Sequence, residues 1–196
     1  SASKLRWLLD HAPGARDLLA RGNLRVGTSD AFFLDRLTGR FVTDVTTASR
    51  TSLMNLRTLA WDPELCALFG VPIEALPEIV PTTGVLGALG GGAGGGIPLC
   101  CSVVDQQAAL FGHGARTPGR CKITFGTGAF CLCVTGERIV SDTASGLLPT
   151  VAWSLAPGER AYALDGGVYH AASCVDWLRG LGLFGCYDEI DGFDGA

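Results

Sequence analysis

Asp105-Gln106-Gln107-Ala108-Ala109-Leu110-Phe111-Gly112 tells more about the fold than any other segment, and Thr124-Phe125-Gly126-Thr127-Gly128-Ala129-Phe130 follows it closely. The acid stands where an apolar strand, expected over Ile97 to Val104, meets a helix. The Gly-Thr-Gly turn lies between two further expected strands. In α/β folds the carboxyl ends of strands open onto the ligand crevice. The sequence therefore predicts an α/β protein with a ligand site near Asp105.

The composition fits a folded protein and argues against several classes of partner. Of its 196 residues 47% are hydrophobic, which is ample for a buried core. The net charge of -4 and the scattered arginines argue against a nucleic-acid surface. No apolar stretch reaches the length that spans a membrane. We expect a small-molecule partner, no nucleic acid and no membrane, and the oligomeric state stays open, a homo-oligomer included.

Eight cysteines raise the alternatives of disulfides or zinc. Their spacing favours neither, because the chain contains no Cys-x-x-Cys pair and its three histidines show no ligand spacing with them. We therefore expect buried, reduced thiols in a cytoplasmic protein, with no protein-bound metal.

The hydrophobic periodicity predicts the following elements. Helices are expected at Lys4 to Asp10, Ala15 to Arg21, Ala31 to Leu37, Ser52 to Leu59, Pro63 to Leu68, Gln106 to Gly112 and Gly167 to Arg179. Strands are expected at Leu24 to Gly27 and Pro98 to Val104, with hairpins joining Arg120 to Phe125 and Ala129 to Thr135, and Thr150 to Leu155 and Arg160 to Leu164. Phe41 to Ser49 and the glycine-rich Gly90 to Gly96 are expected to be loops.

Asp105 and Gln106 suit the handling of a hydroxyl group. Phosphoryl transfer needs an acceptor hydroxyl held in line, a group that takes its proton, and stabilisation of the phosphate oxygens. A carboxylate at a strand end can take the proton, and the Gln106 amide can both donate to and accept from polyol hydroxyls. The alternative is structural: Asp105 is an ordinary helix N-cap, a role that Asp fills often.

The Gly126-Thr127-Gly128 turn also has two interpretations. Successive N–H groups of such a turn can form a concavity for an anion, and Thr127 adds a hydroxyl. A plain hairpin turn is the alternative, because Gly-x-Gly alone is weak evidence.

Several motifs in one order narrow these choices. The chain resembles the FGGY family of carbohydrate kinases, and in particular its members that phosphorylate glycerol. The resemblance is carried by Lys4 to His11, Gly27 to Asp30, Val42 to Thr51, Trp61-Asp62, Leu76 to Ile79, Asp105 to Gly112, Thr124 to Phe130, Gly146 to Leu148 and Trp177 to Arg179.

The resemblance implies an actin/hexokinase-like ATPase fold, with two ribonuclease-H-like domains that are both incomplete here. Residues 1–116 would be the C-terminal part of the first, substrate-side domain, and residues 120–196 the start of the second, nucleotide-side domain. ATP and Mg²⁺ would bind in the cleft between them. By position, the resemblance makes Asp105 the catalytic base and assigns polyol binding to Asp105, Gln106 and Phe130. It assigns nucleotide binding to Gly126, Thr127, Gly128, Ala172 and Asp176.

Departures from the family pattern keep other functions open. The family usually has Gly at the place of Ala172 and Gln at that of Asp176, which motivates a non-catalytic nucleotide-binding sensor or scaffold. Phe32 and Gly96 also depart, so a kinase for a pentulose or another sugar alcohol stays an alternative to a glycerol kinase activity. Family members are much longer, and we expect these 196 residues alone to be inactive.

Overall fold

The computed structural model describes residues 1–141 and 144–192. The first half contains α1 (Ala2–His11), α2 (Ala15–Ala20), α3 (Ser29–Thr38), β1 (Val42–Asp44), α4 (Val45–Ala48), β2 (Met54–Asn55), β3 (Ala60–Trp61), α5 (Pro63–Phe69), η1 (Ile73–Ala75), β4 (Glu78–Val80), β5 (Thr83–Ala88), η2 (Gly92–Gly94), β6 (Pro98–Cys101) and α6 (Asp105–Gly112). The second half contains β7 (Cys121–Phe125), β8 (Ala129–Gly136), β9 (Leu148–Leu155), β10 (Glu159–Val168), α7 (Ala172–Gly180) and η3 (Tyr187–Gly192).

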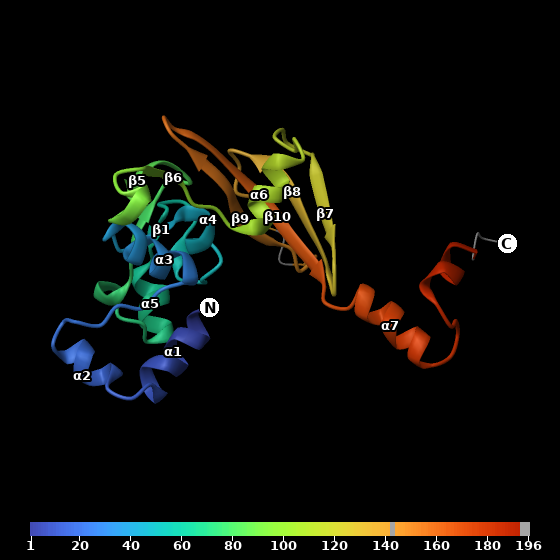
Figure 1. Ribbon diagram of the computed structural model, residues 1–196, viewed down its shortest axis with the longest axis horizontal. Helices are drawn as coiled ribbons and strands as arrows, with labels where there is room; N and C mark the ends of the chain where they lie inside the picture. Colours follow the sequence, from blue (N-terminus) through green and yellow to red (C-terminus); the bar gives the residue numbers. More distant parts are fainter. Residues whose placement is uncertain (142–143, 193–196) are drawn as a thin grey trace.

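The first half up to β6 forms the rounded part on the left of Figure 1, in blue to green, whereas α6 lies over the sheet of the second half. Strand β1 pairs in parallel with β4, and β5 pairs antiparallel with β6. Helix α3 packs on this layer through Leu34, which lies in one core with Val42, Val80 and Leu86. Helices α1 and α5 share a separate core around Leu53.

The second half is built on one antiparallel sheet with the strand order β7-β8-β10-β9. Helix α6 crosses this sheet (Figure 1) and buries Leu110 against Leu132 and Val134. Phe111 of the helix meets Trp153 of β9 edge to face, with ring centroids 5.4 Å apart. The helix is thereby fixed to the sheet that carries Phe130.

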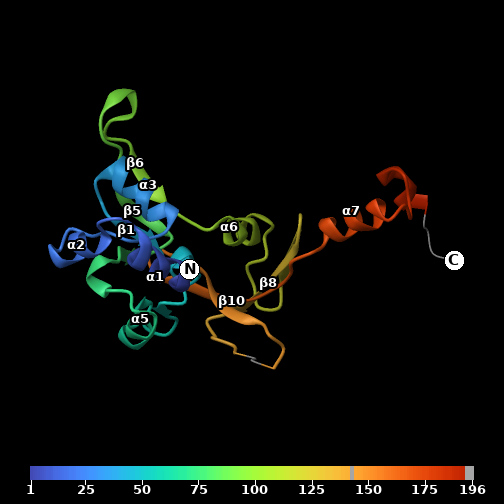
Figure 2. The same ribbon diagram turned by 90° about the horizontal axis from the view of Figure 1, so that it is seen from below.

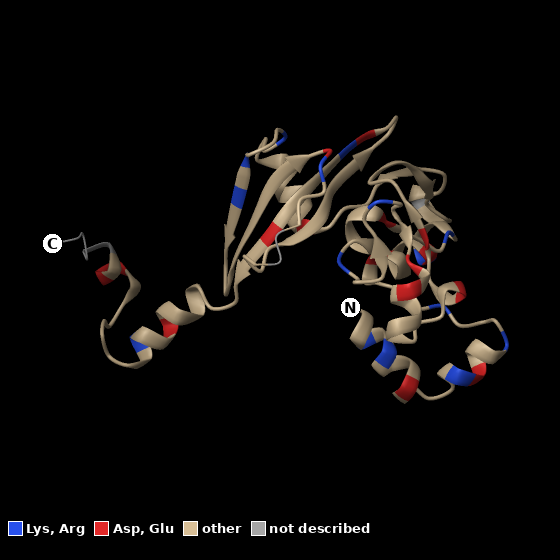
Figure 3. Cartoon of the chain, turned by 180° about the vertical axis from the view of Figure 1, so that it is seen from behind, with Lys and Arg blue, Asp and Glu red and all other residues tan. Residues whose placement is uncertain are grey.

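Beyond the sheet, α7 and η3 project away from both parts (Figures 1 and 2). Charged residues of both signs alternate over the molecule, including this extension (Figure 3). No helix within residues 1–141 and 144–192 has the length and apolar character needed to cross a membrane.

A buried carboxylate organises the junction of β1, α4 and β5. Asp44 is 0% exposed and is the N-cap of α4. It accepts five hydrogen bonds, from the backbone N–H and hydroxyl of Thr46 and of Thr47 and from the hydroxyl of Thr82. Burial raises the pKa of Asp44, and the hydrogen bonds from Thr46 and Thr47 oppose that rise. The carboxylate therefore depends on its donors to remain inside the protein.

The same residues connect the two halves of the chain. Thr82 donates its N–H to the carbonyl of Ser154 in β9 and accepts the N–H of Ser154 on its hydroxyl, at 2.8 and 3.1 Å. Tyr162 donates its hydroxyl to the carbonyl of Leu56 at 2.9 Å. A core that includes Val45, Val151 and Tyr162 runs across the junction. Both polar and apolar contacts thus hold the sheet against the first half.

Most of the predicted elements are confirmed, with each end within four residues of the predicted one. They include both hairpins and the helices that became α1, α2, α3, α5 and α6. The strand predicted after Pro98 is β6, although it ends three residues early, at Cys101.

Four predictions of secondary structure were wrong. Phe41 to Ser49, expected to be a loop, holds β1 and α4, because Asp44 satisfies the first N–H groups of a helix too short to show periodicity. Ser52 to Leu59, expected to be a helix, contains β2 and a turn. Within the described residues Leu24 to Gly27 joins no sheet. Gly167 and Val168 belong to β10, so the helix predicted from Gly167 begins only at Ala172.

We predict that Asp44→Ala lowers the free energy of unfolding by about 3 kcal/mol, because it removes a cap and leaves buried donors unpaired. Asp62→Ala is the matched control, since Asp62 caps α5 in a less buried position; its expected cost is about 1 kcal/mol. Urea unfolding followed by tryptophan fluorescence measures both. Equal losses for the two variants would contradict the role given to Asp44.

Candidate active site

Asp105 is the first residue of α6, and the buried network around Asp44 places it there. The N–H of Val104, directly before Asp105, donates to the Thr46 hydroxyl at 3.1 Å. That hydroxyl donates in turn to Asp44 at 2.8 Å. The entry to α6 is therefore tied to the first half of the chain, and the exposed Asp105 carboxylate is presented from a fixed backbone.

The structure does not make Asp105 an N-cap. Val104 occupies the cap position of α6 and makes no capping hydrogen bond with its side chain. Among the described residues, the only donor to the Asp105 carboxylate is the N–H of Gln106, at 2.7 Å from Oδ1. The other carboxylate oxygen has no donor among the described residues. Asp105 is therefore not the N-cap residue, although its carboxylate does accept from one N–H of the first helical turn.

Gln106 and Phe130, both predicted as substrate residues, line one cavity of about 240 Å³. The lining joins the start of α6 to β8 and β10. Its residues are Arg50, Val104, Gln106, Gln107, Phe130, Leu132 and Asp165. Asp105 is not among the lining residues; it directly precedes Gln106 in the chain. Gln107 is buried and donates its side-chain N–H to the carbonyl of Val151 at 3.2 Å, so its amide anchors α6 to β9.

An ion pair closes one side of this cavity. The guanidinium of Arg50 lies 2.5 Å from the carboxylate of Asp165 on β10. The Asp165 side chain is only 14% exposed. A partly buried pair of this kind holds charged groups of both signs beside a small polar ligand, with little net charge.

The glycine turn links β7 to β8 and also receives the start of α7. Ala171 donates its N–H to the carbonyl of Thr127 at 2.8 Å, and Ala172 to that of Gly126 at 3.1 Å. Four of the five predicted nucleotide residues, Gly126, Thr127, Gly128 and Ala172, are therefore brought together. The hairpin interpretation is confirmed as well, since the turn joins paired strands.

The backbone N–H groups of the turn are the groups that bear on anion binding. Among the described residues, the N–H groups of Thr127 and Gly128 donate no hydrogen bond, although Gly126 donates its own to the carbonyl of Gly128 at 2.8 Å. Two successive free N–H groups in a turn form an anion-binding concavity. The turn is therefore compatible with phosphate oxygens.

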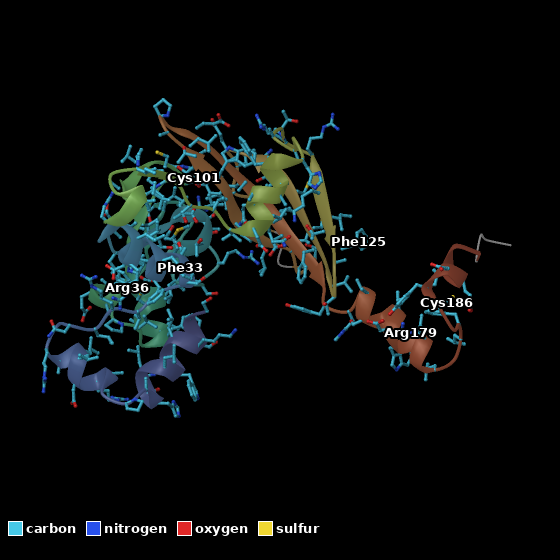
Figure 4. The ribbon with its side chains drawn as sticks, in the orientation of Figure 1. Phe33, Arg36, Cys101, Phe125, Arg179 and Cys186 are labelled. Carbon is cyan, nitrogen blue, oxygen red and sulfur yellow. The ribbon has the colours of Figure 1, made fainter. Side chains whose placement is uncertain are left out.

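Asp176, the fifth predicted nucleotide residue, lies one helical turn further along α7. Its carboxylate accepts a hydrogen bond from the Tyr187 hydroxyl and lies 3.9 Å from Arg179. Figure 4 shows Arg179 on this projecting extension, well beyond Phe125 at the end of β7. The negative charge of Asp176 is thus engaged within the extension, and nothing in the described part of the chain joins it to the turn.

Sequence reasoning missed Lys122 and Arg50 as site residues. It considered Asp165 only as part of Asp165-Gly166-Gly167, a strand-to-helix turn that could approach a nucleotide, whereas these three residues lie within β10. Lys122 is buried on β7 and bonds to Gln106 of α6. The sequence did contain a sign of its role. Lys122 and Thr124 are two residues apart and so lie on the same face of a predicted strand, and the chain has only one other lysine, Lys4. The pairing of Arg50 with Asp165 depends on chain segments 115 positions apart, for which the sequence contains no local signal.

Comparison with known proteins places this site in a family. The family model described as "FGGY family of carbohydrate kinases, N-terminal domain" matches residues 1–112. A glycerol kinase of Alkalilimnicola ehrlichii is 48% identical over 195 residues, which cover 97% of this chain and 39% of that protein. A glycerol kinase of Thermus brockianus is also 48% identical, with the same coverage. The chain spans about 39% of the length of these relatives.

Solved structures of similar fold are kinases as well. A Plasmodium falciparum glycerol kinase with ADP superimposes with a TM-score of 0.90 at 33% identity, covering 96% of this chain and 38% of that one. A xylulose kinase from Rhodospirillum rubrum gives 0.75 at 26% identity, covering 92% and 36%. The fold is the α/β, actin/hexokinase-like ATPase fold expected from the sequence. The chain belongs to the FGGY family of carbohydrate kinases.

We predict that Gly128→Ala lowers the free energy of unfolding by about 1–3 kcal/mol. An added Cβ would lie 2.6 Å from the carbonyl oxygen of Val168 and 3.1 Å from that of Tyr169, so the backbone of β10 would have to move. Gly126→Ala is the control, since its Cβ would meet nothing closer than 3.8 Å. Urea unfolding compares the two, and an equal or larger loss for Gly126→Ala would contradict this packing argument.

Proposed function

We propose that the complete protein transfers the γ-phosphoryl group of ATP to a hydroxyl of a polyol, with glycerol the foremost substrate and glycerol 3-phosphate the product. The observation that carries the proposal is an Asp105 carboxylate with one oxygen that no described residue bonds, directly before Gln106, which lines a cavity together with Phe130. Similarity to glycerol kinases at 48% identity supports the choice of glycerol.

In this mechanism Asp105 orients the acceptor hydroxyl and takes its proton. Its Oδ1 is held by the N–H of Gln106, so the unpaired oxygen faces the incoming hydroxyl. Proton acceptance late in phosphoryl transfer does not require a strong base. Gln106 and Phe130 bind the polyol, the amide through its hydroxyl oxygens and the ring against its carbon chain.

ATP, when bound, supplies the phosphoryl group. The residues that fit it are Gly126, Thr127 and Gly128, because the turn presents two N–H groups with no other partner in the described chain. Ala172 lies against this turn and would contact the nucleotide next to it. Mg²⁺ belongs to the proposal as the companion of the phosphates; such ions are usually bound through few protein carboxylates and keep several waters. Asp176 is included by its position in the family pattern, and in the structure its carboxylate accepts a hydrogen bond from the Tyr187 hydroxyl.

Two further parts of the proposal concern organisation. We place a domain boundary between residues 116 and 120, which agrees with the end of the family match at Gly112 and with the start of the second sheet at Cys121. We also place the protein in the cytoplasm. The expectation that its cysteines are buried is wrong for all but Cys66, because Cys131 and Cys133 are half-buried and the other five are exposed.

Substrate choice can be tested directly, because a relative in fold is a xylulose kinase. The complete protein is assayed for ADP release with glycerol, xylulose and other sugar alcohols in turn. The proposal predicts the highest kcat/KM with glycerol. A preference for xylulose would keep the assignment as a kinase but overturn glycerol as the substrate. ATP binding without any turnover would favour the non-catalytic sensor or scaffold.

We predict that Asp105→Asn lowers kcat by about 10²–10⁴-fold, because the amide cannot accept the hydroxyl proton. The glycerol-dependent release of ADP measures it. Asp17→Asn, on the exposed face of α2, is the control and should keep the wild-type rate. Near-normal turnover in Asp105→Asn would remove Asp105 from the mechanism.

A further inference from the structure

Lys122 is a buried cation in the middle of the candidate site. It lies on β7 and is 6% exposed, whereas Lys4 is exposed on α1. Its ammonium donates to the Thr124 hydroxyl at 2.5 Å, from the same face of β7, and to Oε1 of Gln106 across the gap to α6. A buried ammonium is costly unless its protons are bonded, so these contacts hold it firmly.

The contact with Lys122 decides which way the Gln106 amide points. An ammonium group can only donate, so the atom that it meets on Gln106 must be the carbonyl oxygen. The NH₂ end of the amide is then turned away from Lys122. In the cavity lined by Gln106 and Phe130, that end can only donate to a ligand.

The surroundings of Lys122 favour its charged form against burial. Burial lowers the pKa of Lys122, while the carboxylates of Asp105 on α6 and Asp165 on β10 oppose that shift, with a smaller contribution from Cys131 on β8. Asp165 is itself paired with Arg50. Lys122 is therefore a cationic neighbour of Asp105, whereas Asp165 has Arg50 as its ion-pair partner.

We propose that Lys122 is a positioning residue that sets the polarity of the polyol site: it fixes Gln106 as a hydrogen-bond donor next to Asp105 as an acceptor. The pair then matches the two sides of a hydroxyl group. The hydroxyl oxygen accepts a hydrogen bond from Gln106, and the proton donated to Asp105 comes from the same hydroxyl or from a neighbouring one. This inference rests on the proposed function for its kinetic consequence, but the Lys122–Gln106 contact can be tested without turnover.

The first test uses side-chain NMR on the chain of 196 residues. The chain has only four side-chain amides, on Asn23, Asn55, Gln106 and Gln107, so the Gln106 NH₂ signals are identified by their loss in Gln106→Ala. We expect Lys122→Met to move and broaden these signals and to leave those of Asn23 and Asn55 in place. Lys4→Met is the matched control and should change none of them. Unmoved Gln106 signals in Lys122→Met would overturn the inference.

The second test measures kinetics on the complete protein. Lys122→Met should raise KM for glycerol about tenfold, the value of one hydrogen bond, and change kcat by less than about threefold. In a Gln106→Ala background the same substitution should change KM by less than about twofold, because Lys122 acts through Gln106. A Tm within a few degrees of wild type shows that the variant is folded.

The outcomes separate the inference from the proposed function. A wild-type protein without glycerol turnover, but with Gln106 signals that move in Lys122→Met, overturns the function and retains the contact. An active wild type whose Lys122→Met variant keeps its KM overturns the positioning role. Full additivity of Lys122→Met with Gln106→Ala also overturns it, because it would show that Lys122 acts on the substrate by another route.

Discussion

The buried carboxylate of Asp44 is the constraint on which the arrangement of the site depends. It has no exposed surface and accepts hydrogen bonds from Thr46, Thr47 and Thr82. The Thr46 hydroxyl also accepts the N–H of Val104, and the Thr82 hydroxyl accepts the N–H of Ser154 in β9. A charge in that position is stable only while its donors remain. The start of α6 and the edge of the second sheet are thus held by the same group.

This arrangement lets one short helix serve two purposes. Helix α6 buries Leu110 and Gln107 against the sheet, while Gln106 at its start lines the cavity. Gln106 and Gln107 are chemically identical and adjacent, yet one anchors the helix and the other meets a ligand cavity. The helical turn of about 100° per residue separates them, so the identity of the residue alone does not assign its role.

The candidate site contains more charge than the sequence motifs suggested. Arg50 and Asp165 pair beside the cavity, and Lys122 lies between Gln106 and Thr124. In the partly dry space between α6 and the sheet, such groups orient their neighbours more strongly than they would in water. Under the proposed function, they would orient hydrogen-bonding groups for a polyol before it binds, which would lower the cost of ordering the site.

The sequence by itself determined the fold class, the hairpins, most helices and the set of motifs that identified the family, because these follow from local periodicity, turn residues and motif order. It also singled out Asp105, Gln106 and the Gly126 to Gly128 turn. Only the tertiary structure decided that Val104 rather than Asp105 caps α6 and that α4 forms around Asp44. It alone brought Lys122 to Gln106 and Arg50 to Asp165. These contacts join segments distant in sequence, and their energies depend on burial, which no local pattern contains.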